Sequence, residues 1–166
     1  MVGIVCYRDY SDSEQFIVHD FTSDKEAFIS KLSGISASGG GDLPEDVLGG
    51  MEKALTAVSW TDAPGNTQHG KTVSKVIFHI GDAPAHGKEF QDPGESYTDN
   101  HLDKHSTPRP YKEICQDLAG SKIDYYFAQV KSSGGKVSSS KTACNSLSWP
   151  YLRRLRCFLD SSTRIA

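Results

Sequence analysis

The amino-acid sequence predicts an α/β protein in which helices pack on a sheet. Three observations predict this class. Short apolar runs rich in β-branched residues recur along the chain, and segments with the apolar period of helices alternate with them. The 166 residues suffice for one domain of ordinary size. The expected order, two strands followed by alternating helices and strands, is typical of a layered and mostly parallel sheet.

The first part of the chain predicts a hairpin and a helix. Residues 2–7 and 16–21 are apolar and β-branched, and the polar residues 9–15 separate them, so we expect an antiparallel pair. A helix ending at Gly34 should follow, because four apolar residues share one helical face: Ala27, Phe28, Ile29 and Leu32.

The next segments predict two helices and two strands. Residues 43–58 should form an amphipathic helix with these apolar positions: Val47, Leu48, Met51, Ala54, Leu55 and Val58. Residues 76–80 are apolar on both faces, which indicates a central parallel strand covered on each side, with His79 as a hydrogen-bonded core residue. A short helix at residues 111–119 and an aromatic-rich strand at residues 123–130 complete the predicted domain.

The last 36 residues differ in composition from the region of predicted strands and helices before them. We therefore divide the chain into a domain at 1–130 and a tail at 131–166. Residues 131–148 are rich in Ser, Gly and Lys and are typical of a linker. Residues 149–159 are basic and amphipathic. Such a segment could form a helix on an anionic membrane surface or in a partner's groove, or it could pack on the domain.

Composition excludes several classes of protein. The net charge is −3 and charged residues make up 23% of the chain, which does not suit a basic nucleic-acid binder. No apolar run approaches the roughly 20 residues of a transmembrane helix. The four cysteines are widely spaced and form no zinc-binding or disulfide pattern, so we expect reduced thiols and a cytoplasmic location.

Two acidic residues are candidate metal ligands. Asp82 directly follows the predicted strand at residues 76–80, and Asp42 ends a triple-glycine loop before a predicted helix. Proteins with open parallel sheets commonly bind ions and small molecules at the carboxyl ends of the strands. Carboxylates there suit a hard cation, Mg²⁺ first, with Ca²⁺ or Mn²⁺ as alternatives. The glycines do not form the G-x-x-x-x-G-K-[ST] motif of a phosphate-binding loop, so a nucleotide site is not predicted. No Ser/His/Asp or Cys/His set can be placed at one strand end, so acyl-transfer catalysis is not predicted either.

Each candidate also has a structural interpretation. Asp42 could cap the following helix, and Asp82 could bond to its own turn. His86 lies four residues after Asp82 and could pair with it or approach a metal ion. His101 and His105 have a spacing that would suit zinc on a helix, but their polar surroundings favour a solvated loop.

Two segments carry a family resemblance. GGGDLPEDVLGG at residues 39–50 and FHIGDAPAHG at residues 78–87 resemble the von Willebrand factor A (VWA) domain. More narrowly, they are similar to the VWA domains associated with alpha-type protein kinases. The resemblance covers about residues 2–130.

The resemblance implies a three-layer Rossmann-like sandwich, mostly parallel, with an antiparallel edge hairpin. It also implies a metal-ion-dependent adhesion site, in which Asp42 and Asp82 take the positions of Mg²⁺ ligands. Four neighbours become candidate supporting or partner-contacting residues: Gly41, Glu45, Asp46 and His86. The family's first strand, its ligand loop and the following helix have no counterpart here, so we expect an N-terminally truncated domain with an incomplete site.

These expectations lead to three hypotheses. The first is a non-enzymatic protein-interaction module of VWA type, which binds a protein partner through the strand-end face. The alternative is a targeting or regulatory segment of an alpha-type serine/threonine protein kinase that lacks the catalytic domain. A third hypothesis is a fragment that cannot fold alone, in which the strands at residues 2–7 and 76–80 must pair directly.

Overall fold

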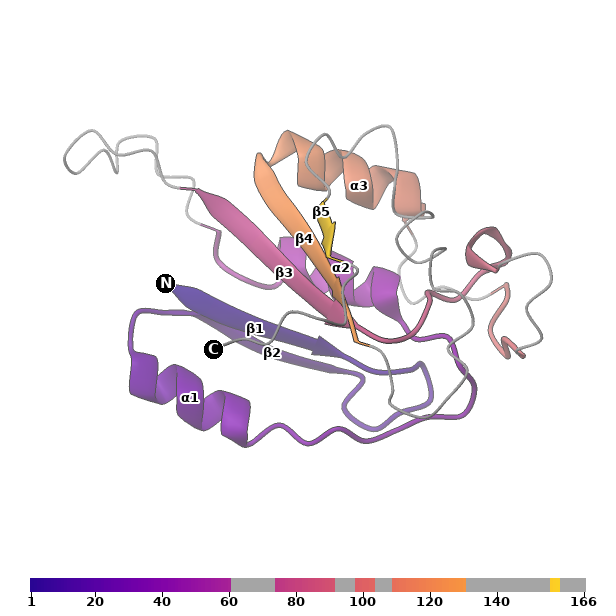
Figure 1. The fold of residues 1–166 in the computed structure, drawn as a ribbon, viewed down its shortest axis with the longest axis horizontal. Coiled ribbons are helices and arrows are strands. Elements are labelled where there is room, and N and C mark those ends of the chain that lie inside the picture. The colour runs from indigo at the N-terminus through magenta and orange to yellow at the C-terminus, as the bar shows by residue number, and fades with distance from the viewer. Residues whose placement is uncertain (61–73, 92–97, 104–108, 131–155, 159–166) are drawn as a thin grey trace.

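The computed structural model describes residues 1–60, 74–91, 98–103, 109–130 and 156–158 (Figure 1). Within them the chain has the predicted α/β class. Its elements, in chain order, are β1 (Val2–Tyr7), β2 (Phe16–Thr22), α1 (Lys25–Ser33), α2 (Val47–Thr56), β3 (Lys75–Gly81), the 3-10 turn η2 (Lys88–Phe90), α3 (Tyr111–Gly120), β4 (Ile123–Gln129) and β5 (Arg156–Phe158).

The described strands form two sheets instead of the single sheet expected. β1 pairs antiparallel with β2, and β3, β4 and β5 form a parallel sheet in that order. Direct pairing of the strands at residues 2–7 and 76–80 was therefore a wrong prediction. A cavity of about 970 Å³ lies between β1 and β3, and side chains of α1 and α2 also line it.

The main core lies on one face of the parallel sheet, where α2 and α3 pack together (Figure 1). Burial of this apolar surface is the main force that holds the layers together. The buried apolar residues are Val47, Leu48, Met51, Phe90, Ile114, Cys115, Leu118, Ile123, Tyr125 and Phe127.

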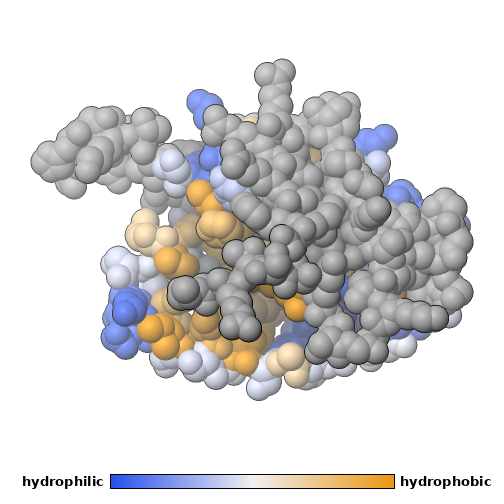
Figure 2. Space-filling view, viewed as in Figure 1, coloured by the Kyte–Doolittle hydropathy of each residue, from blue (hydrophilic) through white to orange (hydrophobic). Residues whose placement is uncertain are grey.

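The opposite face of β3 is not covered by described residues, contrary to the prediction of a strand buried on both sides. Phe78 is 74% exposed and Ile80 is 65% exposed. Phe78 stacks on Tyr126 of the neighbouring strand, with ring centroids 5.2 Å apart. Figure 2 shows hydrophobic surface on the side of the molecule that faces the viewer in Figure 1. The helices α2 and α3 cover only one face, which explains the difference.

Helix α2 begins at Val47, four residues later than predicted, so Asp42 is not its N-cap. The cap is Asp46, whose carboxylate accepts a hydrogen bond from the Gly49 N–H at 2.9 Å. A proline disfavours helical backbone in the residue before it, and Pro44 has this effect on Leu43. A parallel bridge between Glu45 and Ala85 then holds the segment against the loop after β3.

The tail enters the described structure only as β5. Its three residues pair in parallel with β4, so at 156–158 the tail packs on the domain as a strand, and the helical alternative for residues 149–159 does not hold there. The predicted linker and the rest of the tail lie outside the described residues. Among the residues described, no helix has the length and apolar character needed to cross a membrane.

Candidate functional site

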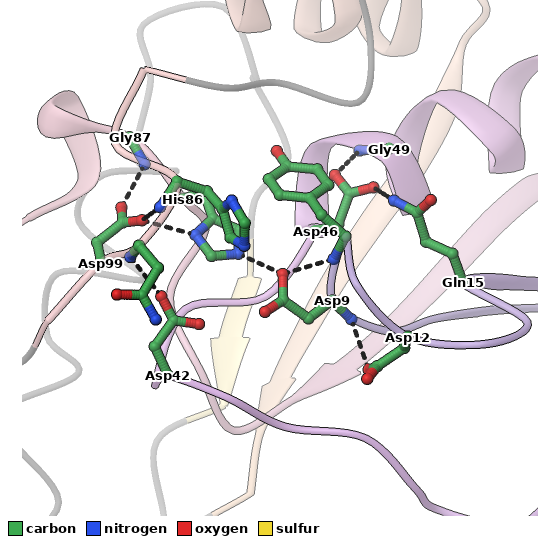
Figure 3. A network of polar contacts seen from close by, with 12 residues as sticks. Asp9, Asp12, Gln15, Asp42, Asp46, Gly49, His86, Gly87 and Asp99 are labelled. Carbon is green, nitrogen blue, oxygen red and sulfur yellow. Dashed lines mark hydrogen bonds and ion pairs between the residues drawn. The ribbon is translucent and has the colours of Figure 1, made fainter.

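Three loops meet at one end of the molecule and bring Asp9, Asp42 and His86 together (Figure 3). Asp9 follows β1, Asp42 precedes α2, and His86 follows β3. Each residue offers one oxygen or nitrogen atom, and these three atoms lie within 4.8 Å of one another. Asp9 and His86 are buried and Asp42 is partly buried. This cluster can hold a metal ion.

Backbone contacts place the three loops. The Arg8 N–H donates to the Gln15 carbonyl at 2.9 Å and closes the hairpin loop that carries Asp9. The Glu45 N–H donates to the Pro84 carbonyl at 2.9 Å, which joins the loop before α2 to the loop after β3. Asp42 lies three positions before Glu45 and Asp82 lies three positions before Ala85, and the two segments run in the same direction because the bridge is parallel.

His86 is held between two carboxylates. Its Nε2 lies 2.7 Å from Asp9 Oδ1, and its Nδ1 lies 2.8 Å from Asp99 Oδ1. Burial by itself would lower the pKa of His86, but the hydrogen bonds and charges of Asp99 and Asp9 outweigh burial and raise that pKa. Burial likewise opposes ionisation of both carboxylates. Their hydrogen bonds, including those to His86, nevertheless lower the pKa of Asp9 and the pKa of Asp99.

Two rings, of Tyr10 and His101, and the backbone of Asn100 lie beside the cluster. Tyr10 stacks on the His86 ring with centroids 4.7 Å apart, and its ring meets that of His101 edge-on at 5.0 Å. The Asn100 N–H donates to Asp42 Oδ2 at 2.6 Å. Among the described residues, two buried side-chain atoms have no hydrogen-bond partner, and both lie here: Asp42 Oδ1 and His101 Nδ1.

The other predicted site residues have different surroundings. Asp82 is exposed and does not belong to the cluster, although its charge acts on Glu45. Burial first, and then the charges of Asp9, Asp12 and Asp82, raise the pKa of Glu45 to about 7. Asp46 caps α2 and also accepts a hydrogen bond from Gln15 at 2.7 Å. Gly41 is exposed.

Part of this cluster is predictable from the sequence. Asp42 is a predicted metal ligand and His86 a predicted neighbour of the metal or of Asp82, but the structure pairs His86 with Asp9 and Asp99 instead of Asp82. Asp9 was missed although it follows a strand closely, which is the signal that selected Asp82. Asp99 has no such signal in the sequence. Of the predicted histidine pair, His105 lies outside the described residues.

A second buried network joins the two sheets. The Tyr7 hydroxyl of β1 lies 2.6 Å from His79 Nε2, and the Tyr125 hydroxyl of β4 bonds to His79 Nδ1. Burial lowers the pKa of His79 to about 4, so the imidazole is neutral at pH 7. The prediction that His79 is a hydrogen-bonded core residue is confirmed.

Comparison with known proteins shows similarity to a protein kinase. The alpha-protein kinase vwkA of Dictyostelium discoideum is 30% identical over 131 residues, which cover 77% of this chain. This chain resembles part of a kinase. The matched region is only 18% of that protein, so the chain spans less than a fifth of the relative's length. No family model matches the chain. No solved structure matches it either.

Proposed function

We propose that this chain is a non-enzymatic protein-interaction module of VWA type, which docks a protein through the strand-end face formed by the loop before α2 and the loop after β3. The observation that carries the proposal is the parallel bridge between Glu45 and Ala85. That bridge joins the segment that follows Asp42 to the loop that follows Asp82, which supports the assignment of both acidic residues to one strand-end face. In this proposal they contribute to an incomplete adhesion site for Mg²⁺, which a partner's carboxylate would complete.

The two buried histidines have carboxylate and tyrosine hydroxyl partners. His86 lies between two carboxylates and His79 between two tyrosine hydroxyls. Neither imidazole has a hydroxyl or thiol nucleophile of Ser or Cys beside it among the contacts of the described residues, as nucleophilic catalysis would require. Cys6 and Cys115 are free thiols, which supports the proposed cytoplasmic location.

The docking proposal is tested by quantitative affinity capture in buffer with Mg²⁺ and with a chelator. We expect defined proteins to bind the wild-type chain with Mg²⁺ and to be lost from the Asp42→Asn/Asp82→Asn double variant. Glu26→Gln, an exposed change on α1, is the matched control and should retain them. Partners that bind the double variant as well as the wild type would contradict this face as the docking surface. Transfer of labelled phosphate from ATP by the purified chain would contradict the non-enzymatic role.

A second candidate function is a targeting or regulatory segment of an alpha-type serine/threonine kinase. The similarity to part of vwkA favours it. Sequencing the full transcript tests this candidate directly. An alpha-kinase catalytic domain in the same reading frame would support the targeting role, whereas a reading frame without one would favour a separate module.

A further inference from the structure

We propose that Asp9, Asp42 and His86 bind a transition-metal cation, Zn²⁺ in preference to Mg²⁺, and that Asp99 positions the imidazole. This proposal goes beyond the proposed function, because the site uses neither Asp82 nor a docked partner. Its ligands come from three loops that the fold itself brings together (Figure 3).

The separation of the ligand atoms suits a small cation. The three atoms lie within 4.8 Å of one another, and Nε2 of His86 is already 2.7 Å from Oδ1 of Asp9. Zinc bonds to nitrogen and oxygen of about 2.0–2.2 Å place neighbouring ligand atoms roughly 3.5 Å apart in a tetrahedron. Side-chain adjustments of less than about 1.5 Å would therefore bring all three atoms to bonding distance.

Unpartnered polar atoms provide an independent reason to expect a ligand here. Within the described part of the chain, Asp42 Oδ1 and His101 Nδ1 are the buried side-chain atoms that lack a hydrogen-bond partner. The other oxygen of Asp42 is fixed by the Asn100 N–H. Burying a polar atom without a partner is costly, and an ion is one of the groups that satisfy such an atom. A cation bonded to Asp42 Oδ1 would provide the missing partner.

Asp99 gives the imidazole the orientation that a metal ligand needs. His86 Nδ1–H donates to Asp99 Oδ1, and the Gly87 N–H fixes the other Asp99 oxygen at 2.9 Å. Histidines that bind metals through one nitrogen commonly donate the other N–H to a carboxylate. In the absence of metal, Nε2–H donates to Asp9. On binding, the cation takes the place of that proton, which passes to solvent.

The ligand types select the metal. One imidazole nitrogen and two carboxylate oxygens suit zinc and its neighbours in the first transition row, whereas Mg²⁺ and Ca²⁺ favour sites made of oxygen alone. Three protein ligands also leave the fourth position of a zinc tetrahedron for water or an additional side chain.

The test uses the full chain, freed of metal by a chelator. Isothermal titration with Zn²⁺ should show one site per chain, and Mg²⁺ should bind at least tenfold more weakly. Asp42→Asn should abolish the site, and Asp99→Asn should weaken it roughly 10- to 100-fold. Asp82→Asn, the matched control, should leave the zinc affinity unchanged. Cobalt(II) should give the intense visible bands of a tetrahedral ion with the wild type and lose them with Asp42→Asn.

Several results would overturn the proposal. They are zinc binding that survives Asp42→Asn, zinc binding that requires Asp82, and a thiolate-to-cobalt charge-transfer band, which would assign the ion to cysteine.

Circular dichroism of each metal-free variant identifies a folding failure. If Asp42→Asn unfolds, Asp42→Ser and the cobalt spectrum serve as the second comparison. Failure of this site leaves a Mg²⁺- and Asp82-dependent docking face intact, so the two proposals are separable.

Discussion

At the scale of single residues, the partners of the two buried histidines, and not burial itself, set their different charge states. His79 has only neutral tyrosine partners, so burial lowers its pKa to about 4. His86 is also buried, but Asp9 and Asp99 raise its pKa despite that burial. The residue type is the same, and the charges of the partners make the difference.

His79 should make the fold sensitive to acid. Its pKa is about 4 in the folded chain and near 6.5 when unfolded, so the unfolded chain binds more protons between these values. This contribution to the free energy of unfolding is complete above pH 6.5 and is lost as pH falls toward 4. The loss amounts to on the order of 3 kcal/mol.

Urea unfolding of His79→Gln at pH 7 and pH 4.5 checks this expectation. The variant should lose less stability between the two pH values than the wild type does. His19→Gln, on the partly exposed strand β2, is the matched control and should keep the wild-type dependence. An unchanged pH dependence in His79→Gln would show that this imidazole does not titrate in that range.

At the scale of elements, helix α2 links the site to the core. Its N-cap, Asp46, is 1% exposed and accepts hydrogen bonds from Gly49 and Gln15. Its first turn carries the buried Val47 and Leu48. The residues just before it carry Asp42. The start of α2 therefore fixes both the packing and the approach of Asp42 to the cluster.

Loss of the buried N-cap Asp46 should lower the free energy of unfolding more than loss of the exposed N-cap Asp24. Asp46→Ala leaves the Gly49 N–H and the Gln15 amide without their acceptor, and we expect about 2 kcal/mol of destabilisation. Asp24→Ala removes the N-cap of α1, which is exposed to solvent, and should cost about 1 kcal/mol or less. Equal losses in chemical denaturation would contradict the special role of Asp46.

Close packing of α2 against β1 depends on Gly50. A Cβ atom there would lie 2.5 Å from the Tyr7 ring, so Gly50→Ala should destabilise the chain by about 1–3 kcal/mol. Gly120→Ala at the end of α3 is the matched control, because nothing lies within 4 Å of its added methyl group. In thermal unfolding we expect the melting temperature of Gly50→Ala to fall clearly below that of the wild type. The melting temperature of Gly120→Ala should change little or rise slightly.

At the scale of the whole molecule, stability is distributed unevenly between the two sheets. β4 contributes Ile123, Tyr125 and Phe127 to the core, whereas β1 and β2 contribute no buried residue. The cavity of about 970 Å³ separates β1 from β3, and the Tyr7–His79 hydrogen bond crosses between the sheets. The hairpin is therefore the less tightly held part.

Hydrogen exchange should resolve this difference. Amides of β1 and β2 should exchange faster than those of β3 and β4, because local opening of the hairpin exposes little buried apolar surface. Mass spectrometry of peptides from the four strands gives the comparison. Uniform protection across them would mean that the sheets unfold as one unit. Rapid exchange throughout would support the hypothesis that the chain is a fragment unable to fold alone.

Local sequence by itself determined the types of most elements, because apolar period, turn residues and strand-forming runs act over a few positions. It therefore predicted the hairpin, the helices near residues 25–33 and 111–120, and the parallel strands at 75–81 and 123–129. Tertiary structure decided where α2 begins, which face of β3 is open and which carboxylates reach His86. These features depend on contacts between segments up to 77 positions apart, such as that of Asp9 with His86, and no local pattern encodes such distances.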